Sequence, residues 1–317
     1  MAAPDSEKSR LDEAARAGWL YFIAGHTQDE IAKMLQISRA SAQRLVSLCL
    51  AERLITFRLE HPIAACMELA ARLKAAFKLA YCEVVPNDPA APQTAAGIAE
   101  RAANVLELKL RSDKPVVVAL GTGRAVRAAV ERVSPIERPN HQIVSLVGNI
   151  SADGSASFFD TVGRLADITR SRHYPMPLPF LMSSGKEREQ MLRLEPISKV
   201  RSLAAKADLR LVGIGQMDEN AQVFVDGFVT RQELFDMMRR GAAGELTGWA
   251  FDADGRIIDA GTNRRLTSIP PRVPATALTI GAAVGKAKVL AIHAALKGRL
   301  INGLITDEAT AGAILRR

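Results

Sequence analysis

Apolar residues recur at helical spacing over the first fifty positions, and further along the chain short apolar runs alternate with helical segments. Residues 11–24 carry small and apolar side chains on one side and predict a first helix. Two shorter amphipathic segments follow at residues 27–35 and 38–50, with Gln36 and Ile37 between them. The pattern therefore predicts a small domain of three helices, in which the last two form a helix-turn-helix pair.

The start of each helix of this pair is marked by a residue that caps helices. Thr27 and Glu30 have the spacing of a capping box, and Ser38 is suited to cap the second helix. Gln36 stands where many such turns have glycine, so we expect a positive φ there at some energetic cost. The residues expected to face inward are Leu11, Ala14, Ala15, Gly18, Trp19 and Phe22 in the first helix, Ile31, Ala32, Met34 and Leu35 in the second, and Ala42, Leu45, Val46 and Cys49 in the third.

The opposite side of the third helix is polar and basic, which suits the major groove of DNA. Arginine pairs with guanine, glutamine pairs with adenine, and serine or arginine contacts phosphate. Base contacts are expected near the N-terminus of such a helix. The alternative is an ordinary helical hairpin with a solvated polar face. The predicted contacts with double-stranded operator DNA are Gln28, Lys33, Ser38, Arg39, Ser41, Gln43 and Arg44.

Beyond residue 61, alternating strand and helix patterns predict a large α/β domain with a parallel or mixed sheet. We therefore expect one domain at residues 1–60 and a second at 61–317, with residues 54–59 as a wing or a link. Expected strands are 82–86, 116–120, 142–147, 209–214, 277–280 and 300–305, with an extended edge or crossover at 173–180. Expected helices are 62–80, 94–110, 125–133, 157–170, 230–240, 286–296 and 307–315.

Composition adds only weak information about partners. The 317 residues are 48% hydrophobic and 24% charged, with a net charge of +8. That charge favours an anionic partner, and residues 33–58 carry about half of it, since five Lys and Arg stand against one Glu there. The three cysteines and five histidines match no metal motif, so we expect reduced thiols, no metal and no cofactor. A polar N-terminus and the lack of a long apolar run favour a cytoplasmic protein that does not enter membranes.

Four predicted strands end in residues that suit ligand binding. In open α/β sheets, ligands bind beyond the carboxyl ends of strands. The four ends carry Gly121-Thr122-Gly123-Arg124, Gly148-Asn149, Gly213-Ile214-Gly215-Gln216 and Thr306-Asp307. The first of these loops matches neither a P-loop nor a dinucleotide motif, because no Gly-Lys-Ser/Thr follows it and Val126 replaces the third glycine. A tight strand-to-helix connection is the alternative interpretation.

The whole arrangement resembles the SorC family of bacterial transcription regulators. The N-terminal helix pair, the Gly-x-Gly-Arg loop, VGIG at 212–215, GAAGELTGWAFDADGRIID at 241–259 and LITDEATA at 304–311 carry the resemblance, in the same order. It implies a Rossmann-like effector domain similar to sugar-phosphate isomerases and glucosamine-phosphate deaminases, acting as a sensor and in oligomerisation. It also implies a tetramer that regulates a sugar or polyol catabolic operon, here as a repressor.

The resemblance also implies where an effector binds. The loop of Gly121, Thr122, Gly123 and Arg124 would hold a phosphate or polyol. Arg265 and Lys286 would supply positive charge, and Gln216, Asp226 and Glu245 would face hydroxyl groups. Gly148, Asn149 and Asp160 are looser matches. For each charged residue, a solvated surface group or a structural ion pair is the alternative.

Three departures from the family pattern bear on the effector. Ala125 replaces a threonine hydroxyl, Ala282-Ala283 replaces two glycines, and Trp249 stands where a polar or basic residue is common. Together they favour an uncharged or weakly charged polyol, such as a short sugar alcohol of the erythritol kind, over a sugar phosphate.

Two other functions are compatible with parts of this pattern. A sugar-phosphate isomerase or deaminase would need a placed general base, for which Asp226, Glu245 and Asp307 are candidates. No histidine–carboxylate pairing is visible in the sequence, so we expect no enzyme and assign no catalytic residue. A large domain that only oligomerises would respond to no small molecule.

Overall fold

The chain folds into two separate units in the computed structural model, which describes residues 4–55, 63–87, 96–150, 154 and 160–317. Unit 1 comprises Met1–His61 and unit 2 comprises Pro62–Arg317. Each unit has its own hydrophobic core, and unit 2 contains the two larger clusters of buried residues.

Unit 1 consists of helices packed through small residues. Its elements are α1 (Pro4–Gly18), the short π-helix η1 (Trp19–Ile23), α2 (Gln28–Met34) and α3 (Arg39–Ala51). At the crossing of α1 and α3, a Cβ on Gly18 would lie 2.2 Å from the Cys49 sulfur, so only glycine permits this approach. The core is made by Ala17, Ile31, Ala32, Ala42 and Val46.

Local sequence chemistry sets the ends of these helices as predicted. The Thr27 side chain accepts a hydrogen bond from the Glu30 backbone N–H, and the Glu30 carboxylate accepts one from the Thr27 N–H, so the capping box is confirmed. Ser38 caps α3 by accepting from the Ser41 N–H at 3.1 Å. Gln36 has φ 55°, the positive value expected in the turn.

Two residues expected to face inward are exposed instead. Trp19 is 56% exposed, because α1 changes into the wider π-helix at this residue and the inward face then passes to Leu20 and Phe22. Met34 is 51% exposed, since Ile31, Ala32 and Leu35 fill the contact that this helix makes. Both predictions were wrong.

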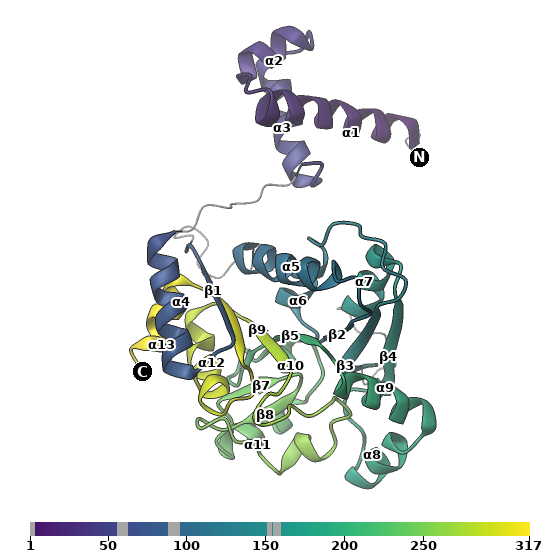
Figure 1. The fold of residues 1–317 in the computed structure, drawn as a ribbon, viewed down its shortest axis with the longest axis vertical. Helices are drawn as coiled ribbons and strands as arrows, with labels where there is room; N and C mark the ends of the chain where they lie inside the picture. Colours follow the sequence, from purple (N-terminus) through teal and green to yellow (C-terminus); the bar gives the residue numbers. More distant parts are fainter. Residues whose placement is uncertain (1–3, 56–62, 88–95, 151–153, 155–159) are drawn as a thin grey trace. The chain divides into compact units, whose positions relative to one another are not determined.

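Unit 2 is built on a seven-stranded sheet in the order β1-β10-β9-β5-β2-β3-β4, in which every neighbouring pair is parallel (Figure 1). The α/β class with a parallel sheet is therefore confirmed. The strands are β1 (Tyr81–Val85), β2 (Val117–Leu120), β3 (Gln142–Ile150), β4 (Arg172–Pro179), β5 (Leu209–Gly213), β9 (Leu278–Ala282) and β10 (Gly303–Asp307).

Helices cover both faces of this sheet, as expected for a parallel sheet whose central strands β2 and β5 are buried. One face packs against α5 (Ala96–Leu110), α6 (Arg124–Val130) and α7 (Thr161–Thr169). The other packs against α4 (Ala64–Phe77), α9 (Glu195–Ala205), α12 (Val289–Lys297) and α13 (Glu308–Leu315) (Figure 1). The remaining helices are α8 (Gly185–Leu192), α10 (Gln222–Val225), α11 (Arg231–Arg239) and the 3₁₀ turns η2 (Gly261–Arg264) and η3 (Lys286–Lys288).

The strand order reverses between β2 and β5. From β2 the chain runs outward through β3 to β4, then returns to β5 on the other side of β2 and continues through β9 to β10. Loops leaving adjacent strands in opposite directions open a crevice at such a point. This position matters because the Gly121–Arg124 loop follows β2 and the Gly213–Gln216 segment follows β5.

A small antiparallel sheet was not predicted. It consists of β6 (Gly215–Gln216), β7 (Gly244–Leu246) and β8 (Trp249–Phe251). Each strand is two or three residues long and largely buried, so it has no apolar/polar alternation for a sequence pattern to detect. Helices α8 and α9 were also not anticipated.

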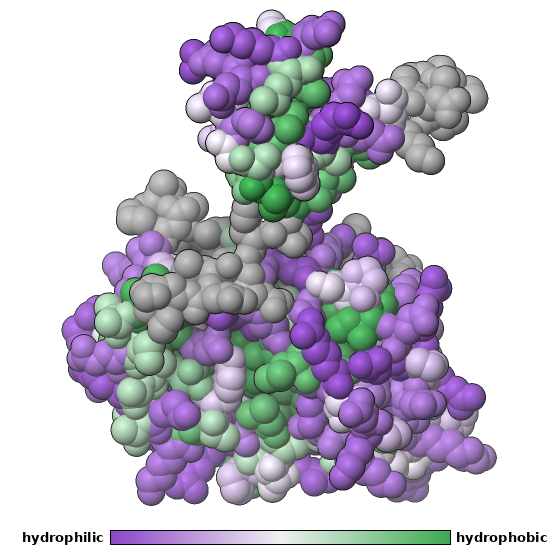
Figure 2. Space-filling model, turned by 45° about the horizontal axis from the view of Figure 1, so that its top comes forward, coloured by the Kyte–Doolittle hydropathy of each residue, from purple (hydrophilic) through white to green (hydrophobic). Residues whose placement is uncertain are grey.

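Most of the expected wing or link at residues 54–59 lies outside the described residues, which resume at 63. Among the helices that the structure describes, none is both long enough and apolar enough to cross a bilayer. On the face shown in Figure 2, hydrophilic residues cover much of unit 2, and apolar residues gather in patches between them.

Candidate functional site

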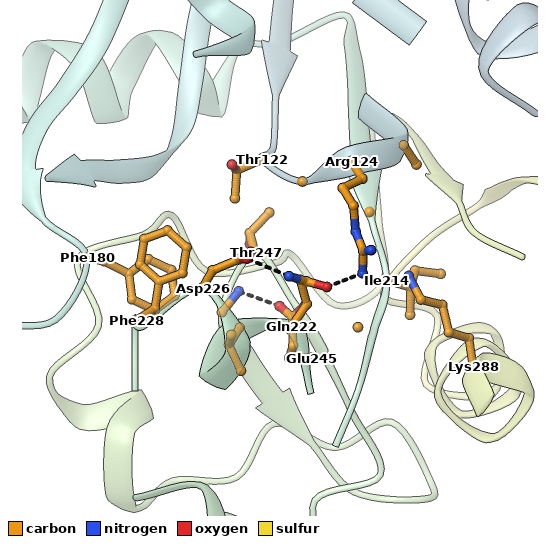
Figure 3. Close-up of a pocket in the computed structure, with 16 residues that line it drawn as sticks. Thr122, Arg124, Phe180, Ile214, Gln222, Asp226, Phe228, Glu245, Thr247 and Lys288 are labelled. Carbon is orange, nitrogen blue, oxygen red and sulfur yellow. Dashed lines mark hydrogen bonds between the residues drawn. The ribbon is translucent and has the colours of Figure 1, made fainter. Parts of the chain in front are cut away.

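A pocket opens where the order of the strands reverses, beyond the carboxyl ends of β2 and β5 (Figure 3). Its empty space amounts to about 660 Å³ when the open solvent at its mouth is included. Its lining comes from the β2 loop, the β5 end, the α10 region, the β7–β8 hairpin and η3. The lining residues are Thr122, Gly123, Arg124, Ala125, Phe180, Gly213, Ile214, Gly215, Gln222, Val223, Asp226, Phe228, Glu245, Thr247, Gly248 and Lys288.

The loop after β2 brings its backbone close to the sheet. The Gly121 N–H donates to the Leu211 carbonyl at 2.9 Å, and the Gly121 carbonyl accepts from the Thr161 hydroxyl at 3.0 Å. Gly123 has φ 108°, a value that L-residues rarely adopt, and it precedes α6 directly. The Thr122 hydroxyl oxygen is buried and has no hydrogen-bond partner among the described residues, so it can serve a ligand.

Three polar side chains form a chain of hydrogen bonds across the pocket, which we call the Arg124–Gln222–Asp226 relay. The Arg124 guanidinium donates to the Gln222 carbonyl oxygen, and the Gln222 amide nitrogen donates to the Asp226 carboxylate (Figure 3). Gln222 and Asp226 are four residues apart, so one turn of α10 presents both side chains on the same side. The relay links the β2 loop to the α10 region.

The β7–β8 hairpin supplies the half-buried glutamate Glu245. Its two turn residues, Thr247 and Gly248, have φ 51° and 88°, as a type I′ turn requires. This turn directs the Gly248 N–H to the Glu245 carboxylate at 2.7 Å. On the neighbouring strand, a Cβ on Gly215 would lie 2.1 Å from a Glu245 oxygen, so glycine is needed to admit this side chain.

Two charged groups of the pocket are poorly solvated. Burial raises the pKa of Glu245, and the Gly248 N–H and the charge of Lys288 oppose this only in part. Burial likewise lowers the pKa of Lys288, with a smaller contribution from Arg124. Lys288 forms no ion pair or hydrogen bond through its side chain with any described residue. Ligand hydroxyl groups can replace the missing solvent at both groups.

The remaining wall is apolar. The rings of Phe180 and Phe228 lie with their centroids 4.6 Å apart at one end of the pocket (Figure 3). Such a wall binds the carbon skeleton of a ligand while the polar groups bind its hydroxyls.

The structure brings some of the predicted effector residues together here and leaves others elsewhere. Thr122, Gly123, Arg124, Asp226 and Glu245 line the pocket. Gly121 does not line it, but its hydrogen bond to Leu211 anchors the start of the loop after β2.

The other predicted residues have different surroundings. Asp160 caps α7 by accepting from the Gly163 N–H, and Arg265 pairs with Glu233 and donates to the Met182 carbonyl. Gly148 packs against Thr267, and Gln216 lies in β6 outside the lining. Lys286 is exposed, while Lys288 two residues later reaches the pocket. The side chain of Asn149 lies outside the described residues.

Several pocket residues were not predicted from the sequence. Gln222, Val223 and Phe228 belong to a segment with no strong helical or strand pattern, and Phe180 ends an apparent edge strand. Thr247-Gly248 could have been found, because a glycine preceded by a short apolar strand and followed by another is a hairpin signal.

The predicted DNA-binding residues lie on the outer side of α2 and α3. Lys33, Ser38, Arg39, Gln43 and Arg44 are exposed, whereas Gln28 and Ser41 are half-buried. Arg39 lies 3.4 Å from Asp29, and Arg44 donates to the Ser41 hydroxyl at 3.1 Å. The buried side of α3 is formed by Ala42, Val46 and Cys49. A basic face opposite an apolar face is thus present.

The chain thus combines a small helical unit with a parallel α/β sheet that has a polar pocket at its switch point. In agreement with this, a family described as "Putative sugar-binding domain" matches residues 61–316. The chain belongs to this family of SorC-type transcription regulators.

Individual relatives support this membership. The erythritol catabolism regulatory protein EryD of Brucella abortus is 32% identical over 95% of this chain and 96% of its own length. The transcriptional regulator LsrR of Escherichia coli K12 is 30% identical over 96% of this chain and 95% of its own length. The first is named a regulatory protein and the second a transcriptional regulator. A role in transcription regulation is therefore confirmed, and these relatives support it over the enzyme alternative.

Solved structures show the same fold. The full-length sorbitol operon regulator SorC from Klebsiella pneumoniae superposes with a TM-score of 0.71 at 22% identity, covering 96% of this chain and 99% of that one. The sugar-binding domain of a transcriptional repressor from Vibrio fischeri gives a TM-score of 0.66 at 24% identity, covering 79% of this chain and 98% of that one.

Proposed function

We propose that unit 1 is a helix-turn-helix domain that binds operator DNA, and that unit 2 is an effector domain, related to sugar-phosphate isomerases, that controls this binding. The observation that carries the proposal is the pocket at the β2–β5 switch point, which has buried polar groups without full partners. Such groups are costly to bury, and a ligand that satisfies them gains binding energy.

The outer face of α3 supports DNA binding. Arg39, Gln43 and Arg44 are exposed and lie within the first two turns, where a recognition helix contacts bases. The ion pair of Arg39 with Asp29 is exposed on both sides and therefore weak, so DNA phosphate can displace the carboxylate.

The balance of charge in the pocket supports a neutral polyol as effector. Arg124 and Lys288 are offset by Asp226 and Glu245 within the same lining. A dianionic phosphate would meet two carboxylates there, whereas hydroxyl groups can donate to carboxylates and accept from the cations. The erythritol regulator among the relatives points to the same class of ligand. A sugar phosphate is the second candidate.

Effector control of DNA binding requires two states of the assembly. We infer a homotetramer in which the effector shifts the population between two geometries. Only one of them would place two copies of α3 at the spacing of operator half-sites. On this scheme the protein acts as a repressor that the effector releases.

A gel shift on the protein's own upstream DNA, titrated with polyols and sugar phosphates, tests this function. We expect Arg44→Ala to weaken operator binding about tenfold or more, because a base or phosphate contact of arginine contributes about 1–3 kcal/mol. Binding of the effector should be unchanged. If both operator and effector binding of Arg44→Ala match the wild type, the assignment of α3 is wrong.

The neighbouring lysines Lys286 and Lys288 provide a matched pair of variants for the pocket. Lys288→Ala should abolish the response to effector, since Lys288 lines the pocket, and Lys286→Ala should retain it, since Lys286 is exposed. Thermal shift with erythritol measures both. An equal loss in the two variants would contradict the proposed site. Strong stabilisation by sugar phosphates and none by polyols would overturn the choice of a polyol.

A further inference from the structure

The corner of the pocket that holds Arg124 is occupied by a neutral amide. Arg124 forms no ion pair with any described residue, and its guanidinium donates to the Gln222 carbonyl oxygen. A free guanidinium in a pocket is the group that binds phosphate best, because its fork of N–H donors matches the phosphate oxygens. Gln222 therefore occupies one nitrogen of the guanidinium, so this nitrogen is not open to an anion.

The orientation of this amide is fixed by chemistry. An ionised carboxylate only accepts hydrogen bonds, so the Gln222 group that faces Asp226 must be the NH₂. The carbonyl oxygen must then face Arg124, as Figure 3 shows. Asp226 thus acts through Gln222: it turns the acceptor end of the amide toward the guanidinium.

Entry of a phosphate would disrupt both hydrogen bonds of the relay. To bind the Arg124 nitrogen inside the pocket, it would have to displace the Gln222 carbonyl, and it would approach the carboxylate of Asp226 on the same side of α10. Glu245 lines the same pocket. A hydroxyl group meets no such barrier, because it can donate to the Gln222 carbonyl oxygen or to Asp226 while the relay stays intact.

We propose that Gln222, oriented by Asp226, is the residue that makes this pocket select an uncharged polyol and reject its phosphate ester. The inference rests on the proposed function, since it concerns the ligand of the same pocket. Gln222 is a specificity-determining residue, and Asp226 is a positioning residue behind it. Arg124 keeps the capacity to bind phosphate once the amide is removed.

Isothermal titration of the full-length protein with erythritol, erythritol 4-phosphate and inorganic phosphate tests the proposal. For the wild type we expect erythritol to bind at least about tenfold more tightly than its phosphate, as befits one charge-assisted contact. In Gln222→Ala the guanidinium is free, so affinity for erythritol 4-phosphate should rise about tenfold or more. Asp226→Asn should also raise the affinity for erythritol 4-phosphate, because it removes both the negative charge and the carboxylate that orients the Gln222 amide.

Gln216→Ala is the matched control, because Gln216 is a glutamine on the adjacent strand β6 that does not line the pocket. It should leave the ratio of the two affinities unchanged. A gain in phosphate affinity cannot result from loss of folding, so an unstable variant cannot imitate the expected result.

Two sets of outcomes separate this inference from the function on which it rests. If the wild type binds the phosphate as tightly as erythritol, or if neither Gln222→Ala nor Asp226→Asn gains affinity for it, the inference is overturned. The proposed function still stands in that case if either ligand changes operator binding in a gel shift. If no ligand of the panel binds any variant or alters operator binding, the proposed function itself fails.

Discussion

Glu245 and Glu233 are two half-buried glutamates of unit 2. Their surroundings shift the pKa of the two carboxyl groups in opposite directions. Burial raises the pKa of Glu245, with only the Gly248 N–H and Lys288 opposing it. Burial would raise the pKa of Glu233 too, but hydrogen bonds from Thr230 and Arg265 outweigh it and lower that pKa. The first carboxylate therefore costs stability when it ionises, and the second contributes stability.

This contrast predicts opposite effects of the same substitution. Glu245→Gln should stabilise unit 2 at neutral pH, because the amide removes the cost of an ionised carboxylate whose pKa is raised, at about 1.4 kcal/mol per pH unit of that rise. The gain in free energy of unfolding over the wild type should develop as pH rises from the ordinary glutamate pKa to the raised one. It should vanish in acid, where Glu245 is protonated in both the folded and the unfolded state. Urea unfolding followed by circular dichroism across pH measures it.

Glu233→Gln is the control of opposite sign. Its carboxylate contributes stability above the unfolded pKa, and this contribution is lost as pH falls through the lowered folded pKa. The variant should therefore be less stable than the wild type at neutral pH and approach it in acid. A loss of stability in Glu245→Gln at neutral pH would contradict the account of that site.

At the scale of elements, α2 and α3 form as predicted from the sequence, but the turn between them contains a residue with an unfavourable backbone conformation. Gln36 is exposed and has φ 55°, a conformation that costs an L-residue about 1–2 kcal/mol. Helix caps on both sides, from Thr27 and Ser38, keep the turn in place despite this cost. Local chemistry thus fixes the helix ends, and the tertiary contact between the helices imposes the turn.

We expect Gln36→Gly to stabilise unit 1 by up to about 1 kcal/mol, because the relief at positive φ exceeds the extra entropy of glycine in the unfolded chain. Thermal unfolding followed by circular dichroism measures the change. Gln43→Gly, at an exposed position inside α3, should instead destabilise the unit by about 1 kcal/mol. Destabilisation by both variants would show that the side chain of Gln36 makes a contact that offsets the strain.

At the scale of the whole molecule, the unfolding of each unit can report the binding of a different ligand: operator DNA for unit 1 and the effector for unit 2. Each has its own core, so calorimetry should resolve two transitions. Erythritol at one hundred times its dissociation constant should stabilise unit 2 by about 2.7 kcal/mol. Operator DNA should raise the transition of unit 1.

Lys288→Ala serves as the control for these transitions. It should abolish the shift caused by erythritol and leave the shift caused by DNA. A shift of the unit 1 transition by erythritol alone, with unit 2 unchanged, would contradict the division of roles between the units.

Residue patterns predicted the class of fold because alternating apolar runs and amphipathic segments are a local consequence of a buried parallel sheet. They also predicted the loop of Gly121 to Arg124, since glycines and a strand end mark close backbone approach. They did not separate Lys286 from Lys288, because the 3₁₀ turn η3 decides which of the two lysines faces inward. The family resemblance suggested Arg265 for the pocket, but in the structure Arg265 pairs with Glu233 and does not line the pocket.

The sequence by itself indicated the strands of the large sheet, most of the helices around them and the caps of α2 and α3, because spacing and capping depend on residues that are close along the chain. Its motifs indicated the family. Only the tertiary structure decided the composition of the pocket. Arg124, Gln222 and Glu245 come from three segments that are far apart in sequence, and they meet because the strand order reverses between β2 and β5. Side chains that meet only through folding leave no periodicity to detect, so the relay that links Arg124 to Asp226 became visible only in the folded chain.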